Sequence, residues 1–321
     1  MFEISTPITF EEFMARALHD PQHGYYARRI SGVGRRGDFT TAPMFSQAPA
    51  AAIADWAAKA LKMTGCRDLI EIGPGEGDLA AGVLRNLPWK LRWKTRLHLV
   101  ETSIPLAARQ RELLGKRATY HTRIQDVLNN CGGKAVIYSN ELVDAFPVRK
   151  FQKTTAGWQE LAVHFDERRR AHESRLAPAS LPDSAGFLDH HPLGQWIEVH
   201  DSYRRFLTDW LPHWNAGRLL TIDYGATTES LYHRKPRGSI RGYLHQQRLE
   251  GPAIYENPGR QDLTADVNFT DLMNWSQPWV SEQRLSTFGE FLQAPRNLDD
   301  SLLADPLGAG GAFLVLDQKR C

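Results

Sequence analysis

Residues 69–79 constrain the fold more than any other segment, because an apolar run there breaks into three glycines at alternate positions. The segment is Leu-Ile-Glu-Ile-Gly-Pro-Gly-Glu-Gly-Asp-Leu, and helix-forming residues resume over 80–85. This pattern predicts a buried strand, a tight turn and a helix start, the unit that forms the ligand crevice of a doubly wound α/β sheet. Glycine suits such a turn because no Cβ blocks the approach of a ligand. A purely structural glycine-rich turn is the alternative.

A second acidic residue follows at the end of the next predicted strand. Residues 96–101 are Arg-Leu-His-Leu-Val-Glu, and residues 105–114 have helical character. In nucleotide-binding α/β folds an acid at this strand end accepts hydrogen bonds from ribose hydroxyls, so Glu101 is a candidate for that role. A solvated glutamate at a strand end is the other interpretation. The glycine spacing is G-x-G-x-G rather than G-x-G-x-x-G, which disfavours a nicotinamide oxidoreductase.

Length and charge bound the class of protein. The chain of 321 residues has room for one large α/β domain with insertions or for two domains, and its 39 basic and 37 acidic residues give no electrostatic case for nucleic acid. Its three cysteines are far apart and lack metal-ligand spacing. No apolar run reaches membrane-helix length and no signal peptide is evident. We therefore expect a cytoplasmic protein with no metal ion and no membrane insertion.

The remaining chain alternates predicted helices and strands. Helices are expected over 8–19, with Thr9 as N-cap, over 48–64 and over 203–214. Strands are expected over 135–139, 196–199, 218–225 and 311–316, with a hairpin over 148–165 and irregular chain over 167–195. This division predicts an N-terminal helical and lid segment over 1–64 and a cofactor-binding half over 65–150. An inserted hairpin and linker would follow over 151–195, and a second half of the core over 196–321.

Polar residues just past the predicted strands are the candidates for chemistry, because ligands in open α/β sheets bind beyond the carboxyl ends of the strands. They include Glu101, Asp126 with Val127, Asn140 with Glu141, and 223–225. The densest set is Asn-Glu-Leu-Val-Asp over 140–144. Its acids, Glu141 and Asp144, would share one face if the segment were helical. A structural salt bridge with Arg149 or Lys150 is the alternative for Glu141.

Several sequence blocks resemble the MidA-like family of S-adenosylmethionine (SAM)-dependent methyltransferases, which includes a mitochondrial complex I assembly factor. The blocks are Gly-Asp-Phe-Thr-Thr-Ala-Pro over 37–43 followed by Ser46-Gln47, Glu-Ile-Gly-Pro-Gly-Glu-Gly over 71–77, Leu-Val-Glu over 99–101, Asn-Glu-Leu-Val-Asp-Ala-Phe-Pro-Val over 140–148, Ile-Asp-Tyr-Gly over 222–225, and Pro-Gly-Arg-Gln-Asp-Leu-Thr-Ala-Asp-Val-Asn-Phe over 258–269. Residues 71–77 also match motif I of the class I methyltransferases. The resemblance extends over nearly the whole chain.

The resemblance implies a Rossmann-like class I methyltransferase core, a doubly wound and mostly parallel sheet with inserted segments, that binds SAM. It implies a protein substrate, with arginine as the first candidate and a respiratory-complex subunit as a candidate partner. A small-molecule methyltransferase and a non-catalytic assembly chaperone are the alternatives. The implied catalytic residues are Glu141 and Asp144. The implied cofactor-binding residues are Asp38, Thr40, Gln47, Glu71, Gly73, Pro74, Gly75, Gly77, Glu101, Asp126, Val127 and Asn140.

This chain departs from the family pattern at a few positions. Met44-Phe45 stands where Glu-Ile is expected, Leu142-Val143 replaces a pair of phenylalanines, and Asn268 replaces an aspartate. These departures leave the expected cofactor unchanged and bear on the identity of the substrate.

Overall fold

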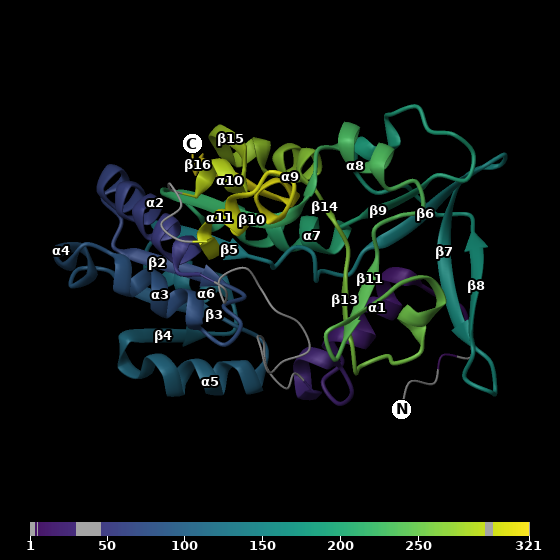
Figure 1. The fold of residues 1–321 in the computed structure, drawn as a ribbon, viewed down its shortest axis with the longest axis horizontal. Coiled ribbons are helices and arrows are strands. Elements are labelled where there is room, and N and C mark those ends of the chain that lie inside the picture. The colour runs from purple at the N-terminus through teal and green to yellow at the C-terminus, as the bar shows by residue number, and fades with distance from the viewer. Residues whose placement is uncertain (1–3, 5, 30–45, 293–297, 321) are drawn as a thin grey trace.

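The computed structural model describes residue 4 and residues 6–29, 46–292 and 298–320 (Figure 1). Within these residues, the central sheet has eight strands, seven of them in the spatial order β4-β3-β2-β5-β10-β16-β15, while β14 pairs with β10. The strands are β2 (Asp68–Ile72), β3 (Arg96–Val100), β4 (Ala118–His121), β5 (Ala135–Asn140), β10 (Arg218–Ala226), β14 (Val267–Asn268), β15 (Val280–Thr287) and β16 (Phe313–Arg320).

Most of the central sheet is parallel, as the sequence predicts. The pairs β3–β4, β2–β3, β2–β5 and β5–β10 are parallel, whereas β16 runs antiparallel to both β10 and β15. The chain passes from β2 outward to β3 and β4 and then returns to place β5 on the other side of β2. This reversal makes the carboxyl ends of β2 and β5 the switch point, where a ligand crevice is expected.

Helices cover both faces of the sheet because its strands are apolar on both sides. Leu69, Val136 and Tyr138 point to a core formed with α2 and α3, whereas Ile70 and Ile137 point to a second core formed with α6, α7 and α9. The helices are α2 (Ala48–Thr64), α3 (Asp78–Asn86), α4 (Trp89–Arg92), α5 (Ile104–Leu114), α6 (Ile124–Asn130), α7 (Asp201–Trp210), α8 (Thr228–Arg234), α9 (Phe269–Ser276), α10 (Phe288–Phe291), α11 (Leu298–Ala304) and α12 (Ala309–Ala312). Tyr138 and Trp210 are completely buried and anchor the two cores.

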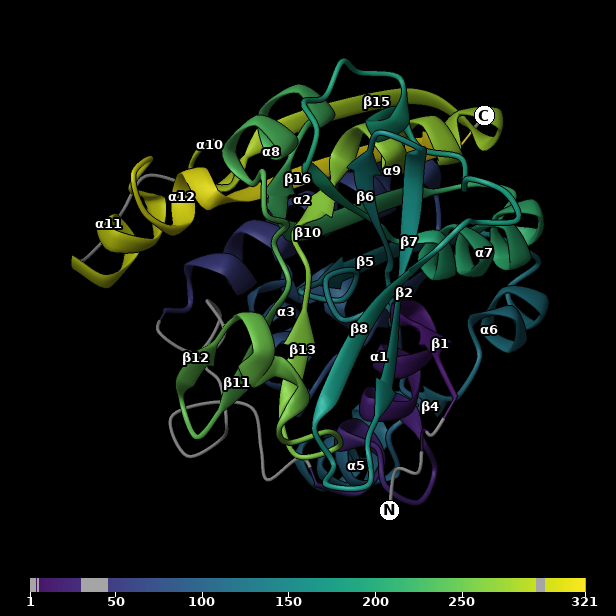
Figure 2. The same cartoon turned by 90° about the vertical axis from the view of Figure 1, so that its right-hand side faces the viewer.

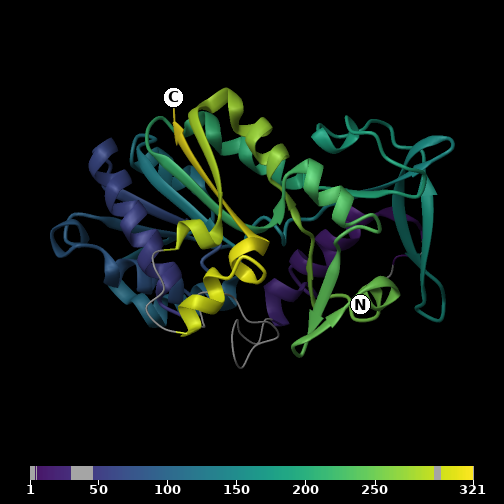
Figure 3. The same cartoon turned by 45° about the horizontal axis from the view of Figure 1, so that its top comes forward.

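A second lobe lies beside the carboxyl ends of the central strands (Figures 1 and 3). It contains a five-stranded antiparallel sheet, a three-stranded sheet and α1, which share their own apolar core. Figure 2 shows the long β7 and β8 running side by side at the edge of this lobe. Its elements are β1 (Ile8–Thr9), α1 (Phe10–His19), the π-helix Tyr25–Arg29, β6 (Arg149–Thr154), β7 (Gly157–Phe165), β8 (Ala171–Leu176), β9 (Trp196–Val199), β11 (Arg241–Leu244), β12 (Gln247–Leu249) and β13 (Asp262–Thr264).

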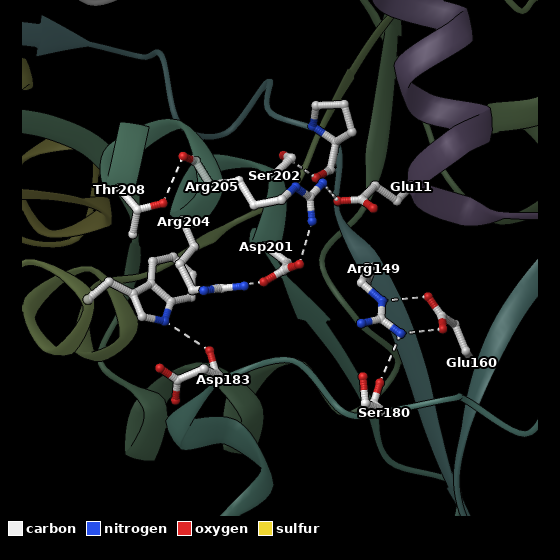
Figure 4. Close-up of polar contacts among 12 residues, drawn as sticks. Glu11, Arg149, Glu160, Ser180, Asp183, Asp201, Ser202, Arg204, Arg205 and Thr208 are labelled. Atoms are coloured by element: carbon white, nitrogen blue, oxygen red, sulfur yellow. Dashed lines mark hydrogen bonds and ion pairs between the residues drawn. The ribbon is translucent and has the colours of Figure 1, made fainter. Parts of the chain in front are cut away.

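Ion pairs tie α1 to a helix of the central domain (Figure 4). Arg205 on α7 bonds Glu11 on α1 at 2.7 Å and also bonds Asp201 on its own helix. The Thr9 side chain caps α1 by accepting a hydrogen bond from the Glu12 backbone N–H at 3.2 Å. Because α1 ends at His19, these contacts set the position of the residues that follow at the edge of the crevice.

The structure differs most from the sequence prediction in two segments, while the helices expected over 8–19 and 203–214 are Phe10–His19 and Asp201–Trp210. The prediction of irregular chain over 167–195 is wrong for Ala171–Leu176, which form β8 and pair with β7 along its whole length. This strand carries charged residues and is largely exposed, so it lacks the apolar alternation that marks a strand in sequence. The last strand begins at Phe313 rather than Gly311, because Ala309–Ala312 form the short helix α12.

Candidate functional site

A cavity of about 820 Å³ opens at the carboxyl ends of β2, β3 and β5. Residues 71–76, 100–104, 122–125 and 140–142 line it from the central domain, and His19, Tyr26 and Ala27 line it from the N-terminal segment. Its position at the switch point is the one that the sheet topology predicts. We call this space the cofactor cavity.

The glycine-rich turn forms the floor of the cofactor cavity and needs glycine for its backbone. Gly73, Gly75 and Gly77 have φ angles of 67°, 57° and 94°, which L-residues with a Cβ rarely adopt. The Gly77 N–H donates to the Pro74 carbonyl at 2.9 Å, and Gly77 is the N-cap of α3. Gly73, Pro74 and Gly75 line the cavity, whereas Gly77 is not part of the lining.

Glu101 lines the cofactor cavity directly after the end of β3. Its Oε1 accepts a hydrogen bond from the Ser103 N–H at 2.7 Å, and its burial raises the pKa of the carboxyl group to about 7. Gln110 on α5 is completely buried and donates from Nε2 to the Gly75 carbonyl at 2.6 Å. Gln110 and Ser103 were not predicted as site residues from the sequence. The available signal for Gln110 was a polar residue on the inner face of a predicted helix.

Glu71 is a buried carboxylate beneath the turn. Its side chain is 1% exposed and accepts a hydrogen bond from the Tyr138 hydroxyl at 2.8 Å, and burial raises its pKa to about 8. Asn140 also lines the cavity, and its buried Oδ1 accepts no hydrogen bond from the described residues. The cavity therefore presents hydrogen-bond acceptors from Glu71, Glu101 and Asn140.

Glu141 occupies a strained position at the end of β5. Its φ is 50°, one of four positive values for non-glycine residues among the described part of the chain, and its N–H donates to the Ile222 carbonyl at 2.9 Å. Asn140 Nδ2 donates to Glu141 Oε1 at 3.0 Å. Strain of this kind is typical of functional sites, because the surrounding structure must hold it in place.

Asp223, within β10, shapes the turn that carries Glu141 and Asp144. Asp223 is completely buried, and its Oδ2 accepts from the backbone N–H groups of Leu142, Val143 and Asp144 at 3.1, 2.9 and 3.3 Å. Burial and the nearby Asp144 raise the pKa of Asp223 well above its usual range. The expectation that 223–225 lie past the end of a strand is wrong, because β10 continues to Ala226. Asp223 instead positions the 142–144 backbone.

The interpretation in which Glu141 and Asp144 share a helix face is wrong, because residues 141–147 form bends and turns. Both side chains nevertheless line a second cavity, of about 690 Å³. The proposed salt-bridge partners of Glu141 are engaged elsewhere: Arg149 bonds Glu160 at 2.6 Å, and Lys150 lies 3.5 Å from Glu198. Figure 4 shows the Arg149–Glu160 pair.

The second cavity meets the cofactor cavity at two residues, Tyr26 and Glu141, which line both. Tyr26 follows α1, and its ring stacks on His19 with centroids 5.7 Å apart. The Tyr26 hydroxyl donates to Asp262 Oδ1 at 2.9 Å. Sequence reasoning missed Tyr26 and His19 as site residues.

Some predicted cofactor residues lie elsewhere. Asp126 is exposed on the first turn of α6 and Val127 is buried in the core, so residues 122–125 line the cavity in their place. Gln47 precedes α2 and accepts a hydrogen bond from Arg85 at 2.9 Å, outside the cavity lining. Asp38 and Thr40 lie outside the described residues, as do Met44 and Phe45.

The cofactor cavity offers the hydrogen-bond acceptors that SAM needs. A SAM molecule carries ribose hydroxyls, an amino group and a sulfonium cation, which need acceptors and negative charge. The cavity supplies oxygens of the Glu101 and Glu71 carboxyl groups and Asn140 Oδ1, which accepts no hydrogen bond from the described residues. In the described part of the chain, no group of three or more His, Cys, Asp or Glu side chains is arranged to hold a metal ion. None of the described helices is long and apolar enough to cross a membrane.

Comparisons with known proteins agree with this assignment. Residues 52–283 match the model of a family described as "Putative S-adenosyl-L-methionine-dependent methyltransferase". A protein from Burkholderia thailandensis, solved with S-adenosyl-homocysteine bound, superposes with a TM-score of 0.83 at 26% identity, and the match covers 98% of this chain and 88% of that one. A native structure of a B. thailandensis protein of the same superfamily superposes with a TM-score of 0.79 at 25% identity, covering 98% and 87%.

Curated relatives include the mitochondrial protein arginine methyltransferase NDUFAF7 from rat and from human. The rat protein is 27% identical over 320 residues, covering 88% of this chain and 69% of the relative. The human protein is 29% identical over 321 residues, covering 88% and 68%. These relatives are mitochondrial by name, so they contradict the prediction of a cytoplasmic protein.

The family model spans well over half of the chain, and the predicted Rossmann-like core is present. The cavity at the switch point carries the acceptors that SAM requires. The chain therefore belongs to this family of S-adenosyl-L-methionine-dependent methyltransferases and uses SAM as its cofactor.

Proposed function

We propose that the protein methylates an arginine side chain of a protein substrate, with Glu141 as the residue that holds the guanidinium. The rat and human relatives are named protein arginine methyltransferases, which supports this choice of acceptor. A respiratory-complex subunit remains the candidate substrate protein that the resemblance implies.

The observation that carries the proposal is the position of Glu141 at the junction of the two cavities. A residue that lines both can contact the cofactor on one side and the methyl acceptor on the other. SAM supplies an activated methyl group on its sulfonium. The task left to the protein is to align the acceptor nitrogen with that methyl group and to manage the proton that the nitrogen loses.

The chemistry of a carboxylate suits this task. A glutamate can pair with the N–H groups of a guanidinium through charge-assisted hydrogen bonds and so orient one nitrogen. The backbone bond from Glu141 N–H to Ile222 and the side-chain bond from Asn140 hold this carboxylate in place. We assign Asn140 to the methionine portion of the cofactor and Asp144 to the acceptor side, as the second carboxylate.

The test uses Glu141→Gln, which removes the charge but keeps the shape. Methyl transfer from labelled SAM to protein in cell extract should fall at least about a hundredfold, the usual scale for a positioned acid–base group. SAM affinity, measured by calorimetry on the same preparation, should stay within a few-fold. Normal turnover in the variant would exclude Glu141 from catalysis, and loss of SAM binding would reassign it to the cofactor.

The same labelling experiment separates the alternatives. Label recovered in an arginine of a protein supports the proposal, whereas label in a low-molecular-weight product indicates a small-molecule methyltransferase. No incorporation by a protein that binds SAM, with extract from the source cells, would indicate an assembly chaperone on a methyltransferase fold.

A further inference from the structure

Two deeply buried aspartates line the second cavity. Its four acidic residues are Glu141, Asp144, Asp262 and Asp266, and its four basic residues are Arg234, Lys235, Arg241 and Arg248. Asp144 and Asp262 are 4% and 2% exposed, so water can stabilise neither carboxylate well. A wall of this kind needs a positive charge from the protein or from a ligand.

The protein's own cations only partly meet this need. Arg241 bonds Asp266, and its guanidinium lies 4.5 Å above the ring of Tyr224. Lys235 Nζ also pairs with Asp266, at 3.2 Å. Arg234 and Arg248 are exposed at the cavity, and Arg248 pairs with Glu250. The ion pairs of Lys235 and Arg241 thus go to Asp266 rather than to Asp144 or Asp262.

Asp144 and Asp262 are instead held by tyrosine hydroxyls. Tyr224 donates to Asp144 Oδ2, and Tyr26 donates to Asp262 Oδ1. The second oxygen of Asp144, Oδ1, is buried and makes no hydrogen bond within the described residues. An unpartnered carboxylate oxygen beside a cavity is costly for a folded protein unless a donor enters that cavity.

We infer that the second cavity binds the cationic side chain of the methyl acceptor, with Asp144 and Asp262 as its specificity-determining carboxylates. This inference rests on the proposed function and adds the direction of entry: the side chain passes Asp262 and Asp144 and reaches the cofactor between Tyr26 and Glu141. The planar guanidinium offers five N–H donors, enough for the free Asp144 oxygen and for Glu141 together.

The charge state of the two carboxyl groups fits this role. Burial raises the pKa of Asp144 to about 6 and that of Asp262 to about 8, and the charge of Asp144 adds to the shift at Asp262. Both groups hold their protons more tightly than a solvated aspartate because burial removes the water that would stabilise the ionised form, while the charge of Arg241 lowers both pKa values in part. A bound cation would add positive charge and favour the ionised forms.

The test measures equilibrium binding of small probes to the protein saturated with S-adenosyl-homocysteine. Binding is monitored by NMR titration. The probes are arginine blocked at both ends as N-acetyl-arginine methylamide, the equivalent blocked lysine, and blocked citrulline, which has the shape of arginine without the charge. We expect blocked arginine to bind at least tenfold more tightly than blocked citrulline. Asp262→Asn and Asp144→Asn should each remove most of that preference.

Controls separate this effect from misfolding. Both variants should keep the wild-type affinity for S-adenosyl-homocysteine, and citrulline binding should be unchanged. Glu282→Gln removes an exposed carboxylate on β15 and should leave all affinities unchanged. If one aspartate variant fails to fold, the other still tests the inference.

The outcomes distinguish the inference from the proposed function. Equal binding of arginine and citrulline, no measurable binding of arginine, or an unchanged preference in Asp262→Asn would overturn the inference. Preferential binding of lysine that depends on the same aspartates would support a cation site and refute arginine as the acceptor. Loss of arginine methylation in Glu141→Gln with no effect of Asp262→Asn would support the proposed function alone.

Discussion

The pKa of Glu101 leads to a specific prediction for cofactor binding. Burial raises this pKa to about 7, while hydrogen bonds from the backbone of Ser103 and Thr102 and from the Gln110 side chain partly oppose the shift. Near neutral pH the free protein therefore contains both the protonated and the ionised carboxyl group. Ribose hydroxyls donate hydrogen bonds, so binding favours the ionised form and nucleoside affinity should rise with pH.

The size of the effect follows from linkage. If only the ionised form binds, the apparent dissociation constant scales with one plus the ratio of protonated to ionised Glu101. With a pKa of about 7, this factor is about 11 at pH 6 and about 1.1 at pH 8. Affinity should therefore increase about tenfold between these values and level off above pH 8.

The assay is calorimetric titration with 5′-methylthioadenosine, which carries the adenosine of SAM but lacks the amino group of the methionine portion and the sulfonium. Glu101→Gln should bind about tenfold to a hundredfold more weakly at pH 8, the scale of a charge-assisted hydrogen bond, and should show no dependence on pH. Glu71→Gln is the control, because Glu71 has a pKa of about 8 in the same cavity. A slope that persists in Glu101→Gln but disappears in Glu71→Gln would refute the assignment of Glu101 to the ribose.

Four further substitutions test the surrounding structure. Gly75→Val should abolish SAM binding but leave the far-UV circular dichroism unchanged, because φ is 57° at this cavity residue; binding within a few-fold of wild type would place the site elsewhere. Gly217→Ala should lower the free energy of unfolding in urea by at least about 2 kcal/mol, since φ is 139° and the new Cβ would lie 1.7 Å from the Ala135 carbonyl oxygen. In Gly65→Ala, with φ of 69° and open space around the site, the loss should be about 1 kcal/mol, and equal losses would contradict the steric argument. Asp223→Ala should reduce methyl transfer at least tenfold with a smaller change in SAM affinity, because the 142–144 N–H groups lose their acceptor; unchanged turnover would show that the turn holds without it.

Local sequence was sufficient to predict those features that backbone geometry and short apolar runs determine. The three glycines of 73–77 predicted a tight turn, and in the structure each of them has a positive φ within that turn. The buried strands ending at Ile72, Val100 and Asn140 were also predictable, because their apolar runs end at a turn or a polar residue. Such features depend on neighbours in the chain.

Positions that depend on packing were harder to predict. Asp126 was expected at a strand end, yet α6 begins at Ile124 and carries Asp126 onto an exposed helical face. The strand β8 lacks an apolar pattern because its pairing with β7 supplies backbone hydrogen bonds rather than a buried face. Neither outcome is encoded within a window of neighbouring residues.

The sequence by itself determined the strand–turn–helix unit that holds the cofactor, since glycine sterics and apolar runs act over a few residues. Only the tertiary structure decided how the acceptor side is built. Tyr26 reaches Asp262 across 236 residues, and Tyr224 reaches Asp144 across 80. These contacts form where two lobes meet, because the burial of separate apolar cores places distant polar side chains against one another, and no local pattern specifies which pairs will meet.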